Sequence, residues 1–119
     1  MYKLKIKRVY QAPDPEDGKR ILVDRLWPRG VRKADAELDF WWKDAAPSPD
    51  LRKWFGHQPE RFVEFSEKYQ DELDRSPMAT VYKEKTQEML EKEPVTFLYA
   101  ARDPVVNHAA VLKQWMEKN

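Results

Sequence analysis

The stretch Ile21-Leu22-Val23-Asp24-Arg25-Leu26-Trp27-Pro28-Arg29-Gly30 joins an apolar run to a dense cluster of charged and aromatic residues. Its apolar start predicts a strand over residues 21–26 that is buried on both faces, as strands of parallel sheets are. In open α/β sheets, ligands bind beyond the carboxyl ends of the strands. The cluster from Asp24 to Gly30 therefore predicts a ligand pocket, with Trp27 at its mouth. The competing interpretation is a strand end whose charged residues only satisfy one another and the local backbone.

The rest of the chain supplies two further strands and several helices. Leu4 and Ile6 alternate with lysines within residues 2–10, which predicts a strand with one wet face or edge. Residues 95–100 are uncharged over their whole length and predict the central strand of the sheet. Capping residues, prolines and apolar stripes predict helices over 48–54, 59–75, 80–92 and from 103 to the C-terminus.

Two details of this prediction concern the middle and the end of the chain. Residues 34–46 fit either one helix or a helical turn followed by an extended segment, and the second is favoured. Asp103 is expected to cap the final helix, with Pro104 in its first turn and Val105 facing the core. Together these elements predict an α/β fold, a single compact domain over residues 1–119 with a small, mostly parallel sheet of about three or four strands flanked by helices.

The composition excludes several classes of protein. With 119 residues, of which 41% are hydrophobic and 36% charged, the chain can build one core and is not typical of a disordered protein. It contains no cysteine, which excludes disulfides, thiolate metal sites and a cysteine nucleophile. The sequence lacks a membrane-length apolar run and a signal-peptide core, so no membrane partner is expected and the cytoplasm is the expected location.

Arginines follow two of the predicted strands. Arg25 and Arg29 lie in the stretch after the first apolar run, and Arg102 lies after residues 95–100. The carboxyl ends of parallel strands share one edge of a sheet, so these residues are expected to meet there. Guanidinium groups are planar, bidentate donors for phosphate and carboxylate, and helix starts attract anions as well. The sequence therefore predicts a site for an anionic small molecule. The residues expected to bind it are Arg25, Trp27, Arg29, Gly30, Arg102 and Asn107.

Three further residues are candidates for proton transfer at this site. His57 and His108 are the histidines of the chain, and imidazole exchanges protons near neutral pH. Asp24 is expected to orient an arginine or a histidine. The histidines lack the spacing of metal-binding motifs, so acid–base or structural roles are favoured and no metal is predicted. No GxGxxG, GxxxxGK[ST] or GxSxG motif occurs, so neither a cofactor nor a serine nucleophile is predicted.

Several stretches resemble one known protein family. The resemblance is to the YeaO-like branch of the domain-of-unknown-function family 488, and it is carried by residues 23–30, 46–48, 51–57 and 98–109. It extends essentially from end to end and implies a compact α/β fold with a small sheet flanked by helices, but no activity. Other branches tend to carry Cys-His-Arg at the start of the last helix, where this chain has Asn107, His108 and Ala109. The resemblance therefore carries over His108 alone from that motif.

Two other functions compete with the binding of an anionic small molecule. Residues 1–33 hold 10 Lys and Arg against 4 Asp and Glu, although the net charge of the whole chain is +1. This basic segment, with Trp27 as a stacking group, is compatible with nucleic-acid binding, which the small net charge makes the weaker hypothesis. The aromatic residues, 13% of the chain, are also compatible with a protein-interaction domain or a dimer surface.

Overall fold

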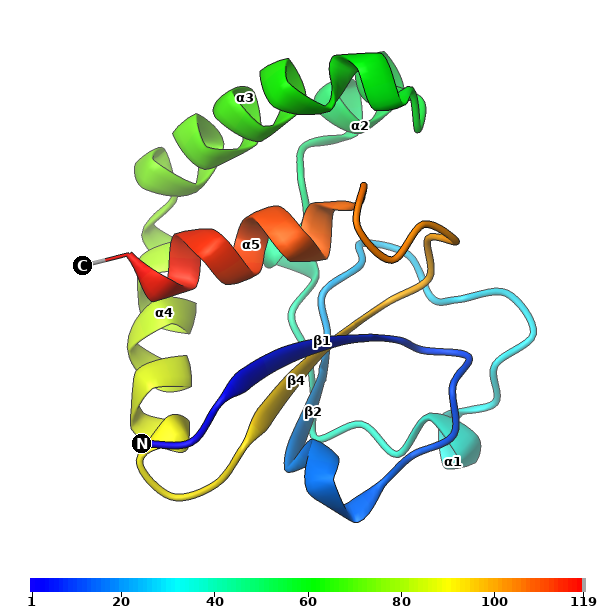
Figure 1. Cartoon of the computed structure of the whole chain (residues 1–119), viewed down its shortest axis with the longest axis vertical. Helices are drawn as coiled ribbons and strands as arrows, with labels where there is room; N and C mark the ends of the chain where they lie inside the picture. The colour runs from blue at the N-terminus through cyan, green and yellow to red at the C-terminus, as the bar shows by residue number, and fades with distance from the viewer. Residues whose placement is uncertain (119) are drawn as a thin grey trace.

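A computed structural model describes residues 1–118 as a four-stranded parallel sheet with helices packed around it (Figure 1). The strands are β1 (Leu4–Arg8), β2 (Lys19–Leu22), β3 (Phe40–Trp41) and β4 (Val95–Tyr99). The helices are α1 (Lys33–Ala36), α2 (Pro49–Phe55), α3 (Phe62–Arg75), α4 (Pro77–Leu90) and α5 (His108–Glu117). Short 3-10 turns form η1 (Pro15–Asp17), η2 (Lys43–Ala45) and η3 (Pro59–Arg61). The α/β fold class predicted from the sequence is confirmed.

The sheet has the strand order β1-β4-β2-β3, and all its neighbouring strands are parallel. Every residue of β4 is buried, which agrees with its uncharged sequence and its central place. The strands β1 and β2 do not pair with each other, because β4 lies between them: Ile6 and Ile21 both align with Phe97. The carboxyl ends of β2 and β4 therefore lie next to each other at the same edge of the sheet.

The two faces of the sheet are covered differently. The main hydrophobic core lies on the face covered by α4 and α5, and α3 packs against these two helices on the side away from the strands (Figure 1). Its fully buried members include Ile21, Val95, Phe97, Phe65, Tyr69 and Leu112. A smaller cluster on the opposite face consists of Val9, Leu22 and Leu98, with Trp27 and Trp41 packed against it. At about 1.5–3 kcal/mol for each large apolar side chain removed from water, the main core is the chief source of stability.

A buried ionic network occupies the part of the sheet near the start of β2. Arg20 and Asp17 are 5% and 4% exposed, and Arg20 Nη1 donates to Asp17 Oδ2 at 2.6 Å. Lys7 Nζ adds a contact to the same carboxylate at 3.0 Å. Burial raises the pKa of Asp17, but hydrogen bonds from the Asp14 backbone, Lys7 and Arg20 together lower it by more, so the net shift is downward. Arg20 also donates to Ala36 O at 2.8 Å, which fastens the end of α1 to the sheet.

The final helix begins later than the sequence predicts. It starts at His108, with Asn107 as its N-cap, and the Asn107 side chain accepts from the backbone of Ala110 at 2.8 Å. The Asp103 carboxylate instead accepts hydrogen bonds from the backbone N–H groups of Val105 and Val106, in the loop before the helix. The cap prediction for Asp103 was wrong because its carboxylate closes a local turn in the loop. Val105, expected to face the core, is 67% exposed for the same reason.

Other boundaries differ by smaller amounts. The region over residues 34–46 is a turn followed by an extended segment, as favoured, because α1 ends with Glu37 in the left-handed conformation. Helix α4 begins at Pro77 rather than at residue 80, because the Ser76 side chain caps it. Strand β2 ends at Leu22, although Val23 N still donates to Leu98 O. Among residues 1–118, no helix is both long and apolar enough to span a bilayer.

Candidate functional site

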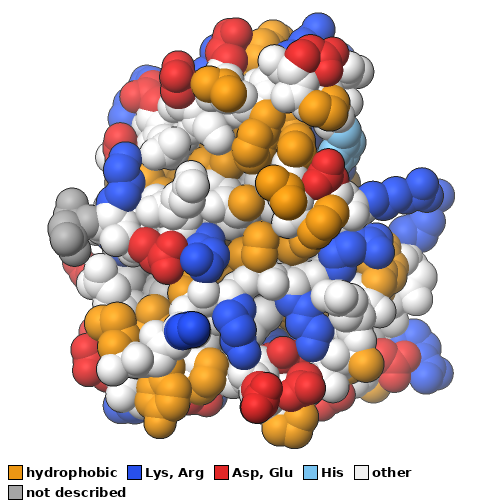
Figure 2. Space-filling view, viewed as in Figure 1, with side chains coloured by type: hydrophobic (Ala, Val, Ile, Leu, Met, Phe, Trp, Pro, Cys, Tyr) orange, Lys and Arg blue, Asp and Glu red, His pale blue; other side chains and the backbone are white. Residues whose placement is uncertain are grey.

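A cavity of about 680 Å³ lies at the carboxyl ends of β2 and β4. Most of its wall comes from the segment after β2, from helix α2 with the residues flanking it, and from the loop between β4 and α5. Single residues after β1, on α3 and at the start of α5 complete it. The sequence-predicted residues that line it are Asp24, Arg25, Trp27, Arg29, His57, Arg102 and His108. Gly30 and Asn107 lie outside the lining; Gly30 forms a turn with a φ of 79°, and Asn107 is the buried cap of α5. Lys and Arg side chains gather on the right of Figure 2, beside apolar and His side chains.

Asp24 and His108 form a close pair in the cavity wall. His108 Nε2 lies 3.1 Å from Asp24 Oδ1 and 3.1 Å from the carbonyl oxygen of Val23. Both neighbours only accept hydrogen bonds, so Nε2 carries a proton whether the imidazole is neutral or charged. Nε2 forms its hydrogen bond with Val23 O, and Asp24 Oδ1 is left buried without a hydrogen-bond donor among residues 1–118. Nδ1 of His108 is consequently the ring nitrogen without a partner in that part of the chain.

The backbone holds Asp24 in this position from both sides. Asp24 Oδ2 accepts from Ala100 N at 3.0 Å, which joins the segment after β2 to the end of β4. The carbonyl oxygen of Asp24 accepts from Trp41 Nε1 at 2.7 Å. Behind the pair, the buried hydroxyl of Tyr69 donates to Ala45 O. Burial raises the pKa of Tyr69, and the negative charges of Glu72 and Asp24 raise it further. Tyr69 is therefore a neutral hydrogen-bond donor at physiological pH.

The arginines of the chain divide into two groups by their partners. Those outside the cavity donate to an acceptor within the chain, either a carboxylate or a backbone carbonyl: Arg8, Arg20, Arg32, Arg61 and Arg75. In the cavity, Arg25 reaches Pro47 O at 3.2 Å, while its Nε is buried with no partner among residues 1–118. Arg29, Arg52 and Arg102 are exposed, and within residues 1–118 their guanidinium groups have neither an ion pair nor a hydrogen bond. The unpaired guanidinium groups are thus collected at one place.

The second carboxylate of the cavity, that of Asp103, is hydrogen-bonded by the backbone of its own loop. Asp103 Oδ1 accepts from Val105 N at 2.8 Å and from Val106 N at 2.9 Å. The hydrogen bonds from Val106 and Val105 lower the pKa of Asp103, so it is ionised at neutral pH. The lining holds four arginines against Asp24 and Asp103, which gives a net charge of +2 with neutral histidines. The cavity is therefore electropositive although the whole chain is nearly neutral.

His57 enters the cavity wall from a strained backbone position. It follows Gly56, the left-handed cap of α2, and has a positive φ of 58° itself. The left-handed region costs an L-residue about 1–2 kcal/mol, and such strain often accompanies a function. The exposed imidazole packs loosely against Phe55, with a ring-centroid distance of 6.2 Å.

Several cavity residues were not predicted from the sequence. Arg52 lies on α2 one turn before its cap Gly56, and it reaches the cavity through the packing of that helix. Phe55 and Phe65 provide an apolar wall, and their rings stack at a centroid distance of 4.2 Å. Tyr10 joins the site from the end of β1, and its hydroxyl donates to Arg29 O at 2.9 Å. No local sequence pattern connects Tyr10 to the cluster after β2.

Neither a metal centre nor a large ionic cluster explains this cavity. Within the part of the chain that the structure describes, no group of three or more His, Cys, Asp or Glu side chains is arranged to hold a metal ion. The functional groups of the cavity are instead guanidinium donors, a histidine paired with an aspartate, and an apolar wall.

The fold and the cavity define a small α/β protein with an electropositive site at the carboxyl ends of its strands. The chain belongs to the family described as the inactive DUF488-N3 subclade, whose model matches residues 3–119. It is 41% identical to the uncharacterised protein YeaO of Escherichia coli K12, an alignment that covers 95% of this chain and 96% of YeaO. It is 47% identical to the uncharacterised protein Rv3073c of Mycobacterium tuberculosis H37Rv, over 94% of this chain and 92% of that protein. No solved structure matches the chain at a significant level.

Proposed function

We propose that this protein binds an anionic small molecule, bearing a phosphate or a carboxylate, in the cavity at the carboxyl ends of β2 and β4. The observation that carries the proposal is the distribution of unpaired guanidinium groups. Arg29, Arg52 and Arg102 come from three different segments, yet all of them line one cavity, whereas the arginines elsewhere are paired within the chain. A guanidinium fork matches the geometry of phosphate and carboxylate oxygens.

Binding without turnover is the favoured form of this function. The family description calls the subclade inactive, and the chain has no cysteine to serve as a nucleophile. Asp24, His57 and His108 remain predicted acid–base residues, and the pairing of His108 with Asp24 supports a positioning role. We therefore assign His108 Nδ1 to a hydrogen bond with the ligand, and His57 to the mouth of the site.

Nucleic-acid binding is the weaker alternative, because the basic N-terminal segment is largely engaged within the fold. Lys7 and Arg20 are paired with Asp17, and Lys5 donates to a backbone carbonyl. Arg32 is paired with Asp35. A cation that is already paired contributes less to phosphate binding and counterion release.

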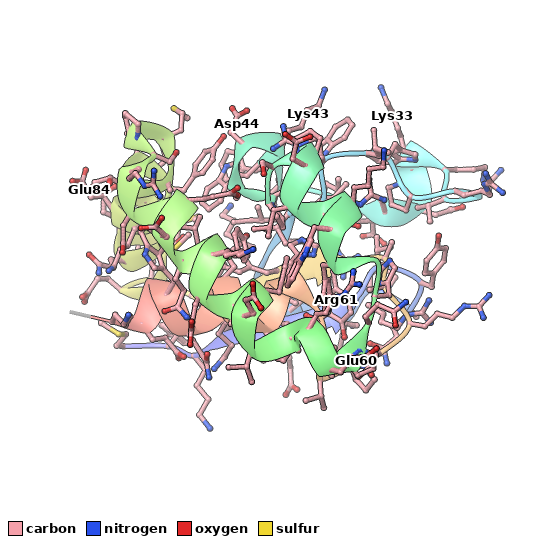
Figure 3. All side chains as sticks on the ribbon, turned by 90° about the horizontal axis from the view of Figure 1, so that it is seen from above. Lys33, Lys43, Asp44, Glu60, Arg61 and Glu84 are labelled. Carbon is pink, nitrogen blue, oxygen red and sulfur yellow. The ribbon has the colours of Figure 1, made fainter. Side chains whose placement is uncertain are left out.

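The proposal is tested by a pair of charge-matched triple variants. Arg29→Ala/Arg52→Ala/Arg102→Ala removes the unpaired guanidinium groups. The control, Arg32→Ala/Arg61→Ala/Arg75→Ala, removes the same charge from outside the cavity; Arg61, labelled in Figure 3, is the residue just before α3.

Binding of inorganic phosphate and of phenyl phosphate is measured by NMR titration of backbone amides. The cavity variant should lose at least about 100-fold in affinity, since each charge-assisted hydrogen bond contributes about 1.5–3 kcal/mol. The control variant should bind within about threefold of the wild type, because none of its three arginines lines the cavity. Equal binding by both variants, or no binding of either anion to the wild type, would overturn the proposal.

A further inference from the structure

The cavity is much larger than a simple oxyanion requires. Its volume of about 680 Å³ lies within the range of about 300–1,000 Å³ that is typical of sites for whole small molecules. An inorganic phosphate or an acetate would fill a small part of this space. The cavity therefore has room for a ligand that extends beyond its anionic group.

The walls of the cavity differ in chemistry. The unpaired guanidinium groups of Arg29, Arg52 and Arg102 are exposed. The buried rings of Phe55 and Phe65 form part of the remaining wall. Such a division is typical of sites for amphipathic molecules, in which charged groups fix one end and apolar surface receives the other.

Two of the apolar side chains that line the cavity are exposed to solvent. Leu26 is 61% exposed and Tyr10 is 46% exposed, and both line the cavity. Trp27 lies beside them, with its indole N–H already bonded to Val31 O at 2.7 Å. Aromatic rings and guanidinium planes both stack on flat ring systems.

The charge of the lining indicates the kind of anion. The net charge of +2 matches a phosphate monoester, which carries about −1.5 to −2 at neutral pH, better than it matches a single carboxylate. We infer that the ligand is a phosphate monoester of a planar ring compound, of the class that includes nucleoside monophosphates. This inference rests on the proposed anion-binding function. The phosphate meets the arginines, and the ring lies against the apolar side chains of the lining, which include Leu26, Phe55 and Phe65.

The test compares four probes on the wild-type protein: inorganic phosphate, butyl phosphate, phenyl phosphate and adenosine monophosphate. Phenyl phosphate or adenosine monophosphate should bind at least about tenfold more tightly than inorganic phosphate, a difference of about 1.4 kcal/mol. The affinity of butyl phosphate should lie between that of inorganic phosphate and those of the two ring compounds. If butyl phosphate equals the ring compounds, the planar ring is refuted. If all four probes bind equally, the extended body is refuted while anion binding stands, and if none binds, the proposed function itself fails.

A matched pair of apolar variants locates the ring. Leu26→Ala should weaken phenyl phosphate by about threefold to fivefold, as expected for losing part of an apolar contact, and leave inorganic phosphate unchanged. The control Val63→Ala alters a residue of α3 that is 73% exposed and outside the cavity, and it should change neither. Equal affinities of Leu26→Ala and Val63→Ala for phenyl phosphate would contradict this position of the ring.

Discussion

Removing Arg20 should destabilise the protein more than removing any exposed arginine. Arg20 is 5% exposed, and it satisfies Asp17 Oδ2 at 2.6 Å together with the carbonyl oxygens of Ala36 and Glu37 at 2.8 and 3.2 Å. In Arg20→Ala, the Asp17 carboxylate keeps only Lys7 as a charged partner, and the buried carbonyl of Ala36 and the partly buried carbonyl of Glu37 lose the Arg20 donor. Breaking a buried ion pair from one side costs about 3–5 kcal/mol, a large part of the 5–15 kcal/mol typical of a whole domain.

Urea unfolding followed by far-UV circular dichroism measures this loss. With a slope of about 1.5 kcal/mol per molar, a loss of about 4 kcal/mol lowers the unfolding midpoint by about 2.7 M. The control Arg32→Ala breaks a pair whose side chains are 82% and 60% exposed, and it should cost less than about 0.5 kcal/mol. A fall of less than about 0.5 M in Arg20→Ala would refute the structural role given to this network, because the two pairs would then be equivalent.

Three further predictions follow from single backbone and ionisable groups. Because the pKa of Asp17 is lowered in the folded protein, its carboxylate contributes fully to stability above the unfolded pKa of about 3.9, and this contribution is lost as the pH falls through the lower folded pKa. The urea midpoint of the wild type should therefore fall between pH 7 and pH 2, and the midpoint of Asp17→Asn should fall by less. An equal fall in both proteins would contradict this role of Asp17. Gly18→Ala should lower the free energy of unfolding by more than about 3 kcal/mol, because the added Cβ would lie 1.9 Å from Pro94 O. Gly30→Ala should lower it by about 1 kcal/mol, because only the positive φ is strained there. Similar thermal midpoints for the two variants would show that the backbone near Gly18 shifts at little cost. His57→Gly should be about 1 kcal/mol more stable than His57→Ala, because glycine adopts a φ of 58° without strain. Both variants should bind phosphate more weakly than the wild type. Equal stability of the two variants would argue against backbone strain at this position, and unchanged binding would argue against a role for the imidazole.

The central strand and the grouping at its edge could be predicted from the sequence. The uncharged residues of β4 require burial on both faces, which identifies the strand and its place in the sheet. The topology of a parallel sheet then brings Asp24 and Arg102, distant in sequence, to a common edge. These steps use only burial and strand direction, which a single sequence expresses well.

The start of the last helix and the full extent of the cavity could not be predicted. Asp103 and Asn107 are both good capping residues, and the choice between them depends on which backbone N–H groups the loop presents. Arg52 and Tyr10 reach the cavity only through the packing of α2 and the end of β1 against it. Local patterns carry no information about such contacts between distant segments.

The most direct test of the anion site is an NMR titration of the arginine side-chain Nε–H resonances with phenyl phosphate. We predict saturable shifts for Arg29, Arg52 and Arg102, whose guanidinium groups have no partner within residues 1–118, and no saturable shift for Arg32 and Arg75. Saturation at one common ligand concentration would identify a single site that these groups share. Shifts of equal size for all the arginines, or shifts confined to those outside the cavity, would contradict an anion site formed by these three residues.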